Sequence, residues 1–137
     1  MAAAPTFSCD SSLSPVIVVQ MPARWLSPGH LAACLREMTD CHRLGCIVFV
    51  VDVRGAAKPN ATQRAVIASA VRDAQKTHPG SVRAIAVVAN STLAKGIFVA
   101  LDWLAPQRRP LRFFTDRDAA IRWASGLFAS DHATKAP

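Results

Sequence analysis

The feature that most constrains the fold is an uninterrupted apolar run at positions 46–51, which ends in Asp52 and is followed by Arg54 and Gly55. The run contains only Cys, Ile, Val and Phe, and β-branched residues dominate it. A short run of this kind is typical of a strand that is buried on both faces, as at the centre of a parallel sheet. In open α/β sheets the binding groups gather beyond the carboxyl ends of the strands, so we expect the loop at 54–62 to carry function.

Further β-branched runs predict strands at 16–19, 82–89 and 111–114. Apolar residues at helical spacing predict a helix after each strand. The residues predicted to cap these helices are Ser27 with Pro28, Asn60 with Gln63, Asn90 with Ser91 and Thr92, and Thr115. The residues of the third helix predicted to face inward are Leu93, Ile97, Ala100, Leu101 and Leu104.

Strand and helix therefore alternate in the order β-α-β-α-β-α-β-α, with short connections. This alternation predicts an α/β fold with about four mainly parallel strands and about four helices on the faces of the sheet. At 137 residues the chain is long enough for one domain with a core of its own. We expect a flexible N-terminal arm at 1–14, a single domain at 15–129 and a C-terminal tail at 130–137.

The composition limits the classes of partner. Lys and Arg number 16 against 9 Asp and Glu, which gives a net charge of +7 and favours anionic partners by long-range attraction. The basic residues are scattered, without a stripe interleaved with aromatics, so nucleic acid is not the expected partner.

No stretch approaches the roughly 20 apolar residues of a membrane helix, and no signal peptide is recognisable. We therefore expect a cytoplasmic protein without a transmembrane segment.

The cysteines are interpreted as free thiols, because an apolar core without an export signal favours a reducing compartment. The spacing of Cys41, His42 and Cys46 matches no strong zinc pattern, and buried thiols explain these cysteines better. Asp52 and Gly55 have the D-x-x-G form of a nucleotide switch, but the chain has no Gly-rich phosphate loop. Neither a metal nor a cofactor is expected.

Several segments share their order and spacing with a known family. They are 47–55, 62–64, 84–91, 95–96, 103–106 and 113–114 leading into 119–123. Together they cover roughly residues 16 to 128 and resemble the STAS superfamily of anti-sigma-factor antagonists, and more closely its small bacterial single domains. No motif among them is specific by itself, because each is a fold-level pattern of strand end, helix cap and packing glycine.

The resemblance implies a regulatory domain that binds a protein partner, such as a kinase or another signalling protein. In regulatory STAS domains a Ser or Thr at the start of the helix after the central strand is phosphorylated. In the matching segment, Ala61 replaces one of the usual hydroxyl residues and Thr62 is the hydroxyl that remains. Thr62 is therefore the candidate phosphorylation site, where phosphate would change the pairing of a helix N-terminus. The alternative is an ordinary residue of the first helical turn.

The candidate partner-binding surface consists of the loops after the second and third strands. Its residues are Arg54, Lys58, Asn60, Thr62, Asn90, Ser91, Thr92 and Lys95. The second loop offers hydroxyls, helix N–H groups and a cation to an anion or a partner carboxylate, although simple helix capping explains it equally well. Phe98 and Trp103 do not both fit the inward stripe of their helix, so they belong either to the core or to an oligomer face, such as a homodimer contact.

We thus expect a non-catalytic regulatory protein-interaction module of STAS type. The alternative is a carrier or sensor of a small apolar or anionic ligand, as in lipid-exchange domains, held between the sheet and the helix at 93–104. A ligand-sized cavity would favour this alternative, and a fully packed core would favour the protein partner. An enzyme is not expected, because the sequence contains no nucleophile elbow and no paired carboxylates.

Overall fold

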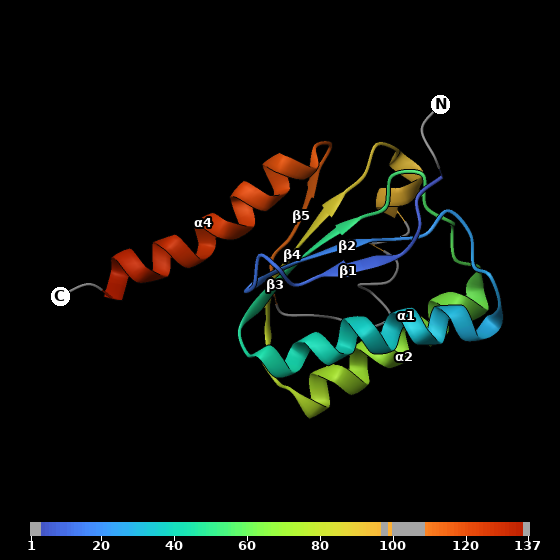
Figure 1. Ribbon diagram of the computed structural model, residues 1–137, viewed down its shortest axis with the longest axis horizontal. Coiled ribbons are helices and arrows are strands. Elements are labelled where there is room, and N and C mark those ends of the chain that lie inside the picture. Colours follow the sequence, from blue (N-terminus) through green and yellow to red (C-terminus); the bar gives the residue numbers. More distant parts are fainter. Residues whose placement is uncertain (1–3, 97–98, 100–108, 136–137) are drawn as a thin grey trace.

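The computed structural model describes residues 4–96, 99 and 109–135, and a five-stranded sheet in the order β1-β2-β3-β4-β5 forms its centre (Figure 1). The strands are β1 (Ser8–Asp10), β2 (Val16–Gln20), β3 (Ile47–Asp52), β4 (Val82–Val88) and β5 (Leu111–Phe114). The helices are α1 (Pro28–Asp40), the short 3-10 helix η1 (Cys41–Leu44), α2 (Ala61–Thr77) and α4 (Arg117–Lys135), and residues 92–96 are also helical. The predicted α/β class is confirmed.

The strand predicted from the central apolar run is β3, the middle strand of the sheet. It runs parallel to β2 on one side and to β4 on the other, with Val50 opposite Val18 and Ala86. Every residue of β3 is buried, which an uninterrupted apolar sequence allows. The strand begins at Ile47, so Cys46 lies just before it and is exposed, contrary to the expectation of a buried thiol.

The two faces of the sheet are covered by different helices. Figure 1 shows α1 and α2 side by side on one face and α4 on the other. Val48 and Val50 of β3 point to the α4 face, where Ala120 and Ala124 are fully buried against them. Because side chains alternate along a strand, Phe49 belongs to the cluster on the opposite face, toward α1 and α2.

The sheet is mixed, because β1 pairs antiparallel with β2, with Cys9 opposite Val19. This strand lies within the segment 1–14 that the sequence predicts to be an arm. Its sequence is Ser-Cys-Asp, and only Cys9 is half-buried while the other two residues are exposed. The strand therefore contains no apolar run from which it could be predicted. The expectation of about four mainly parallel strands is thus corrected to five strands, of which β1 is antiparallel.

The predicted starts of the first two helices are confirmed. Ser27 Oγ accepts a hydrogen bond from the His30 N–H at 3.2 Å, and Pro28 is the first residue of α1. Asn60 and Gln63 form both bonds of a capping box at the start of α2, at 2.8 Å and 2.9 Å. These local patterns determine where each helix begins.

The predictions for α4 need correction at both ends. Its cap is Asp116 rather than Thr115, because the helix begins at Arg117 and Asp116 Oδ2 accepts from the Ala119 N–H at 3.2 Å. The helix continues to Lys135, so residues 130–135 of the predicted tail are helical.

In the helix after β4, Ser91 Oγ accepts a hydrogen bond from the Ala94 N–H at 3.1 Å, as a capping residue would. Leu93 was expected to face inward, but it is 55% exposed, and the next residue, Ala94, is half-buried. A helix turns by about 100° per residue, so a shift of one residue in the predicted stripe accounts for the error. Phe98 and Trp103 lie outside the described residues. So do the other residues of that stripe, which are Ile97, Ala100, Leu101 and Leu104.

Candidate binding site

The loops that follow β3 and β4 lie at the same edge of the sheet. These strands are parallel neighbours, with Asp52 opposite Val88, so their carboxyl ends coincide. The Val53 N–H donates to the carbonyl of Val88 at 3.0 Å and joins the two chain segments just beyond the strand ends. The proximity that the sequence suggests for loops 54–62 and 90–95 is therefore present in the structure.

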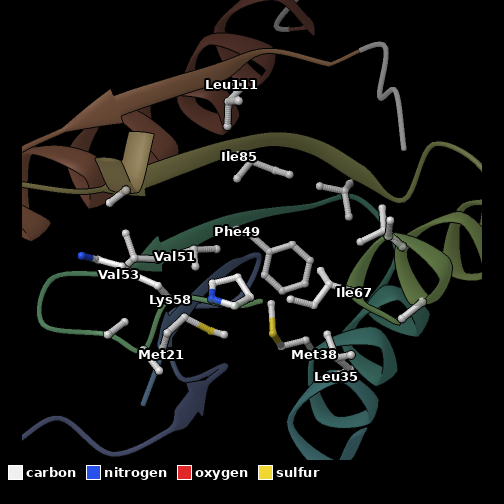
Figure 2. Close-up of a pocket in the computed structure, with 18 of the residues that line it drawn as sticks. Met21, Leu35, Met38, Phe49, Val51, Val53, Lys58, Ile67, Ile85 and Leu111 are labelled. Carbon is white, nitrogen blue, oxygen red and sulfur yellow. The ribbon is translucent and has the colours of Figure 1, made fainter. Parts of the chain in front are cut away.

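A partly enclosed pocket of about 320 Å³ opens beneath this edge, between the sheet and the pair of helices α1 and α2 (Figure 2). Figure 2 shows Phe49 and Val51 of β3 pointing toward the helices, with Met38 of α1 and Ile67 of α2 facing them. The further apolar residues of its wall include Met21, Leu35, Val53, Ala68, Ala70, Val71, Ile85 and Leu111. The alternative function placed a cavity against the helix at 93–104. Among the described lining residues, those on helices come from α1, η1, α2 and, with Ala94, from the start of that helix, whose residues 97–98 and 100–104 lie outside the described part of the chain.

Both loops contribute to the lining of this pocket. Residues 55–59 line it from the loop after β3, and Asn90, Ser91 and Ala94 line it from the loop after β4. Lys58, Asn90 and Ser91 belong to the surface predicted from the sequence, and the structure brings them together at the pocket. Asn60, Thr62 and Thr92 are exposed at the two helix starts nearby, and Lys95 is half-buried.

The polar groups of the lining are few and carry positive charge or hydrogen-bond donors. Of the described residues that line the pocket, the charged ones are Lys58 and Arg109, and both are cations. Trp25 also lines the pocket, and its indole Nε1 is buried without a hydrogen-bond partner among the described residues. A buried N–H without an acceptor costs about 1–3 kcal/mol.

His42 adds a neutral polar group to the wall. It is 8% exposed, and its Nδ1 lies 2.6 Å from Ser81 Oγ, which also places the start of β4 against η1. Burial, with smaller effects from the charges of Arg109 and His78, lowers the pKa of His42 from 6.5 to about 4. His42 is therefore uncharged at neutral pH. No local pattern in the sequence indicates that this histidine is buried.

A cluster of charged side chains lies on the α4 side of the same edge, and the sequence did not predict it. Asp52 is 1% exposed, and its carboxylate accepts hydrogen bonds from Arg54 at 2.8 Å and from Arg117 at 3.1 Å. Arg117 also donates to Gln20 Oε1 at 2.5 Å, so the group joins β2, β3 and the first turn of α4. Arg54 was predicted to belong to the partner-binding surface, whereas its guanidinium turns to Asp52 and is 38% exposed.

These arginines keep the buried carboxylate ionised. Burial alone would raise the pKa of Asp52, but the hydrogen bonds from Arg54 and Arg117 outweigh burial and hold the pKa below its ordinary value of 3.8. An acidic residue at the end of a buried strand, with Arg two positions later, was visible in the sequence. The distant partner Arg117 was not, because no local pattern relates it to Asp52.

Two features are absent from residues 4–96, 99 and 109–135. No group of three or more His, Cys, Asp and Glu residues there could hold a metal ion. In the same part of the chain, no helix has the length and apolar character needed to cross a membrane.

Comparisons of the chain with models of protein families, with curated proteins and with solved structures found no match.

Proposed function

We propose that this domain is a non-catalytic binding protein whose pocket takes a small amphipathic molecule, apolar over most of its length and anionic at one end. The observation that carries this proposal is the 320 Å³ pocket, whose apolar walls are combined with cations and without an acidic residue among the described lining. Ligand pockets typically measure about 300–1,000 Å³ and combine apolar walls with a few convergent polar groups. The size of this one indicates a ligand at the small end of that range.

The apolar part of the ligand would lie along Phe49, Val51, Met38 and Ile67, which come from β3, α1 and α2. Burying apolar area there is worth about 25 cal/mol per Å². The two methionines of the wall, Met21 and Met38, suit a binding site because their unbranched side chains adapt to different shapes.

The polar end of the ligand would lie at the loops. Lys58 supplies an ammonium group from the loop after β3, and Asn90 and Ser91 supply hydrogen-bond donors from the loop after β4. A neutral apolar molecule of the same length would bind more weakly, because it would satisfy fewer of these donors.

Isothermal titration calorimetry of the full chain with octanoate and with octanol tests this proposal. We expect saturable binding of both, with octanoate tighter. Ala70→Leu places a larger side chain on the pocket wall and should weaken the affinity for both ligands at least tenfold. Ser69→Leu, on the exposed side of the same helix, should leave both affinities unchanged. Absence of saturable binding, or equal affinities in the two variants, would contradict the pocket as the site.

The charge of the ligand is tested separately. Lys58→Glu should weaken the binding of octanoate and leave the affinity for octanol nearly unchanged, because only the carboxylate of octanoate interacts with the ammonium group. Lys76→Glu is the matched control, since Lys76 is exposed near the end of α2 and does not line the pocket. Equal weakening by both variants would indicate long-range attraction by the net charge instead of a contact at Lys58.

A second candidate function is the STAS-type regulatory module, which would bind a protein partner through the exposed loops. The observation that favours it is the exposure of Lys58, Asn60, Thr62 and Asn90 near one edge of the sheet. Affinity capture from native lysate with wild type, Thr62→Asp and Lys95→Glu tests it, because a negative charge in the first turn of α2 preserves the helix. A partner retained by wild type and lost by either variant supports this function. The same proteins captured by all three would argue against it.

A further inference from the structure

Two thiols from distant parts of the chain lie next to each other at the edge of the sheet. Cys9 is on β1 and Cys41 begins η1, and their Sγ atoms are 3.7 Å apart although the residues are separated by 32 positions. Both residues are half-buried and pack against the apolar cluster on the α1 and α2 face of the sheet. A disulfide has an S–S distance of about 2.05 Å, so these sulfurs are neighbouring thiols rather than a bonded pair.

We propose that Cys9 and Cys41 form a modification site that oxidises reversibly to a disulfide linking β1 to the end of α1. The approach that this bond requires is small, from 3.7 Å to about 2 Å. β1 is an edge strand of three residues, paired only with β2, so few contacts oppose a small shift toward Cys41. The other cysteines are differently placed, since Cys34 is buried and Cys46 is exposed before β3.

The oxidant is a small disulfide such as oxidised glutathione. The Cys41 thiolate attacks one sulfur of glutathione disulfide, forms a mixed disulfide and releases one glutathione thiolate. Cys9 then gives its proton to solvent, and its sulfur attacks the Cys41 sulfur and releases the second glutathione. In total two protein thiols are oxidised to one disulfide, and one glutathione disulfide is reduced to two thiols.

The surroundings of Cys9 favour this order. Burial, together with the neighbouring Cys41, raises the pKa of Cys9 to about 12, so Cys9 remains protonated at neutral pH. The thiolate is the nucleophile in disulfide exchange, so Cys9 is poorly suited to the first attack, which we assign to Cys41. A mixed disulfide at Cys41 has no S–H and no charge on its sulfur, so the contribution of Cys41 to the raised pKa of Cys9 disappears and only the larger effect of burial and the nearby acids remains.

The test uses the purified full chain in buffers of reduced and oxidised glutathione, followed by alkylation of the remaining thiols and non-reducing peptide mapping by mass spectrometry. We expect a linked pair of peptides containing Cys9 and Cys41, lost after dithiothreitol. Cys46→Ser is the matched control and should form the same link, while Cys9→Ser and Cys41→Ser should not. A wild-type protein that carries glutathione on Cys46 but forms no link between Cys9 and Cys41 would overturn the proposal.

A second measurement does not depend on the folding of the cysteine variants. A disulfide closing this loop restricts the unfolded chain, so the oxidised wild type should unfold at a temperature roughly 5 °C or more above the reduced protein. The Cys46→Ser protein should show the same shift. An oxidised protein with an unchanged or lower unfolding temperature would mean that the link is not compatible with the fold, and would contradict the proposal.

Discussion

Asp52 and Arg117 are 65 residues apart in the sequence, and their side chains form an ion pair of 3.0 Å in the structure. The contact joins the end of the central strand to the first turn of α4. Because Arg54 binds the same carboxylate at 2.8 Å, one buried acid holds two guanidinium groups at the edge of the sheet. Breaking a buried ion pair by removing one partner is destabilising, because the other charge loses its compensation.

Asp52→Ala should therefore lower the free energy of unfolding by about 2–3 kcal/mol, less than for a fully buried pair because both arginines are more than one-third exposed. Arg117→Ala should cost about 1–2 kcal/mol, since Arg54 remains to pair with the carboxylate. Urea denaturation followed by circular dichroism measures both. Arg122→Ala, at an exposed position of the same helix, is the control and should change stability by less than about 0.5 kcal/mol.

The pKa of Asp52 predicts a loss of stability in acid. The folded protein holds this pKa below the ordinary value of 3.8, so the unfolded chain takes up the proton first as the pH falls. The contribution of Asp52 is complete well above pH 3.8 and declines below it. Unfolding free energies measured between pH 5 and pH 2 should fall more steeply for the wild type than for Asp52→Asn, and parallel curves would contradict the ion pair.

His42 predicts a separate change at higher pH. Its pKa is about 4 in the folded protein and close to 6.5 in the unfolded chain, so between these values only the unfolded chain binds the proton. Stability should decrease as the pH falls from 6.5 to 4, by up to about 3 kcal/mol, because each tenfold change in proton affinity is worth about 1.4 kcal/mol. His42→Gln should flatten the curve in this range while leaving the decline below pH 4 in place.

The capping box of α2 predicts a smaller effect. Asn60→Ala removes the acceptor of the Gln63 N–H and should lower the free energy of unfolding by about 1 kcal/mol. Ser69→Ala, at an exposed position in the interior of the same helix, should cause no loss. Chemical denaturation compares the two variants, and equal effects would show that the cap contributes nothing beyond helix propensity.

Much of the fold followed from short stretches of sequence. The β-branched run before Asp52 predicted the central strand, and Ser27 and Asn60 predicted the starts of α1 and α2. These features depend on contacts within about four residues, such as a cap accepting a nearby N–H, or on the burial that an uninterrupted apolar run requires. Where the local pattern was weaker, as at Thr115 and Leu93, the prediction was wrong by one residue.

Tertiary structure decided the features that depend on distant partners. β1 is a strand because β2 offers it an edge, and its own sequence contains no apolar run. The pocket exists only where side chains from β3, α1 and α2 meet, and Cys9 approaches Cys41 only through the pairing of β1. Sequence spacing carries no information on such contacts, because they form between segments whose separation along the chain is unrelated to their distance in the fold. The sequence by itself determined the elements with a strong local pattern, and the packing of those elements determined the edge strand β1 and which residues share a site.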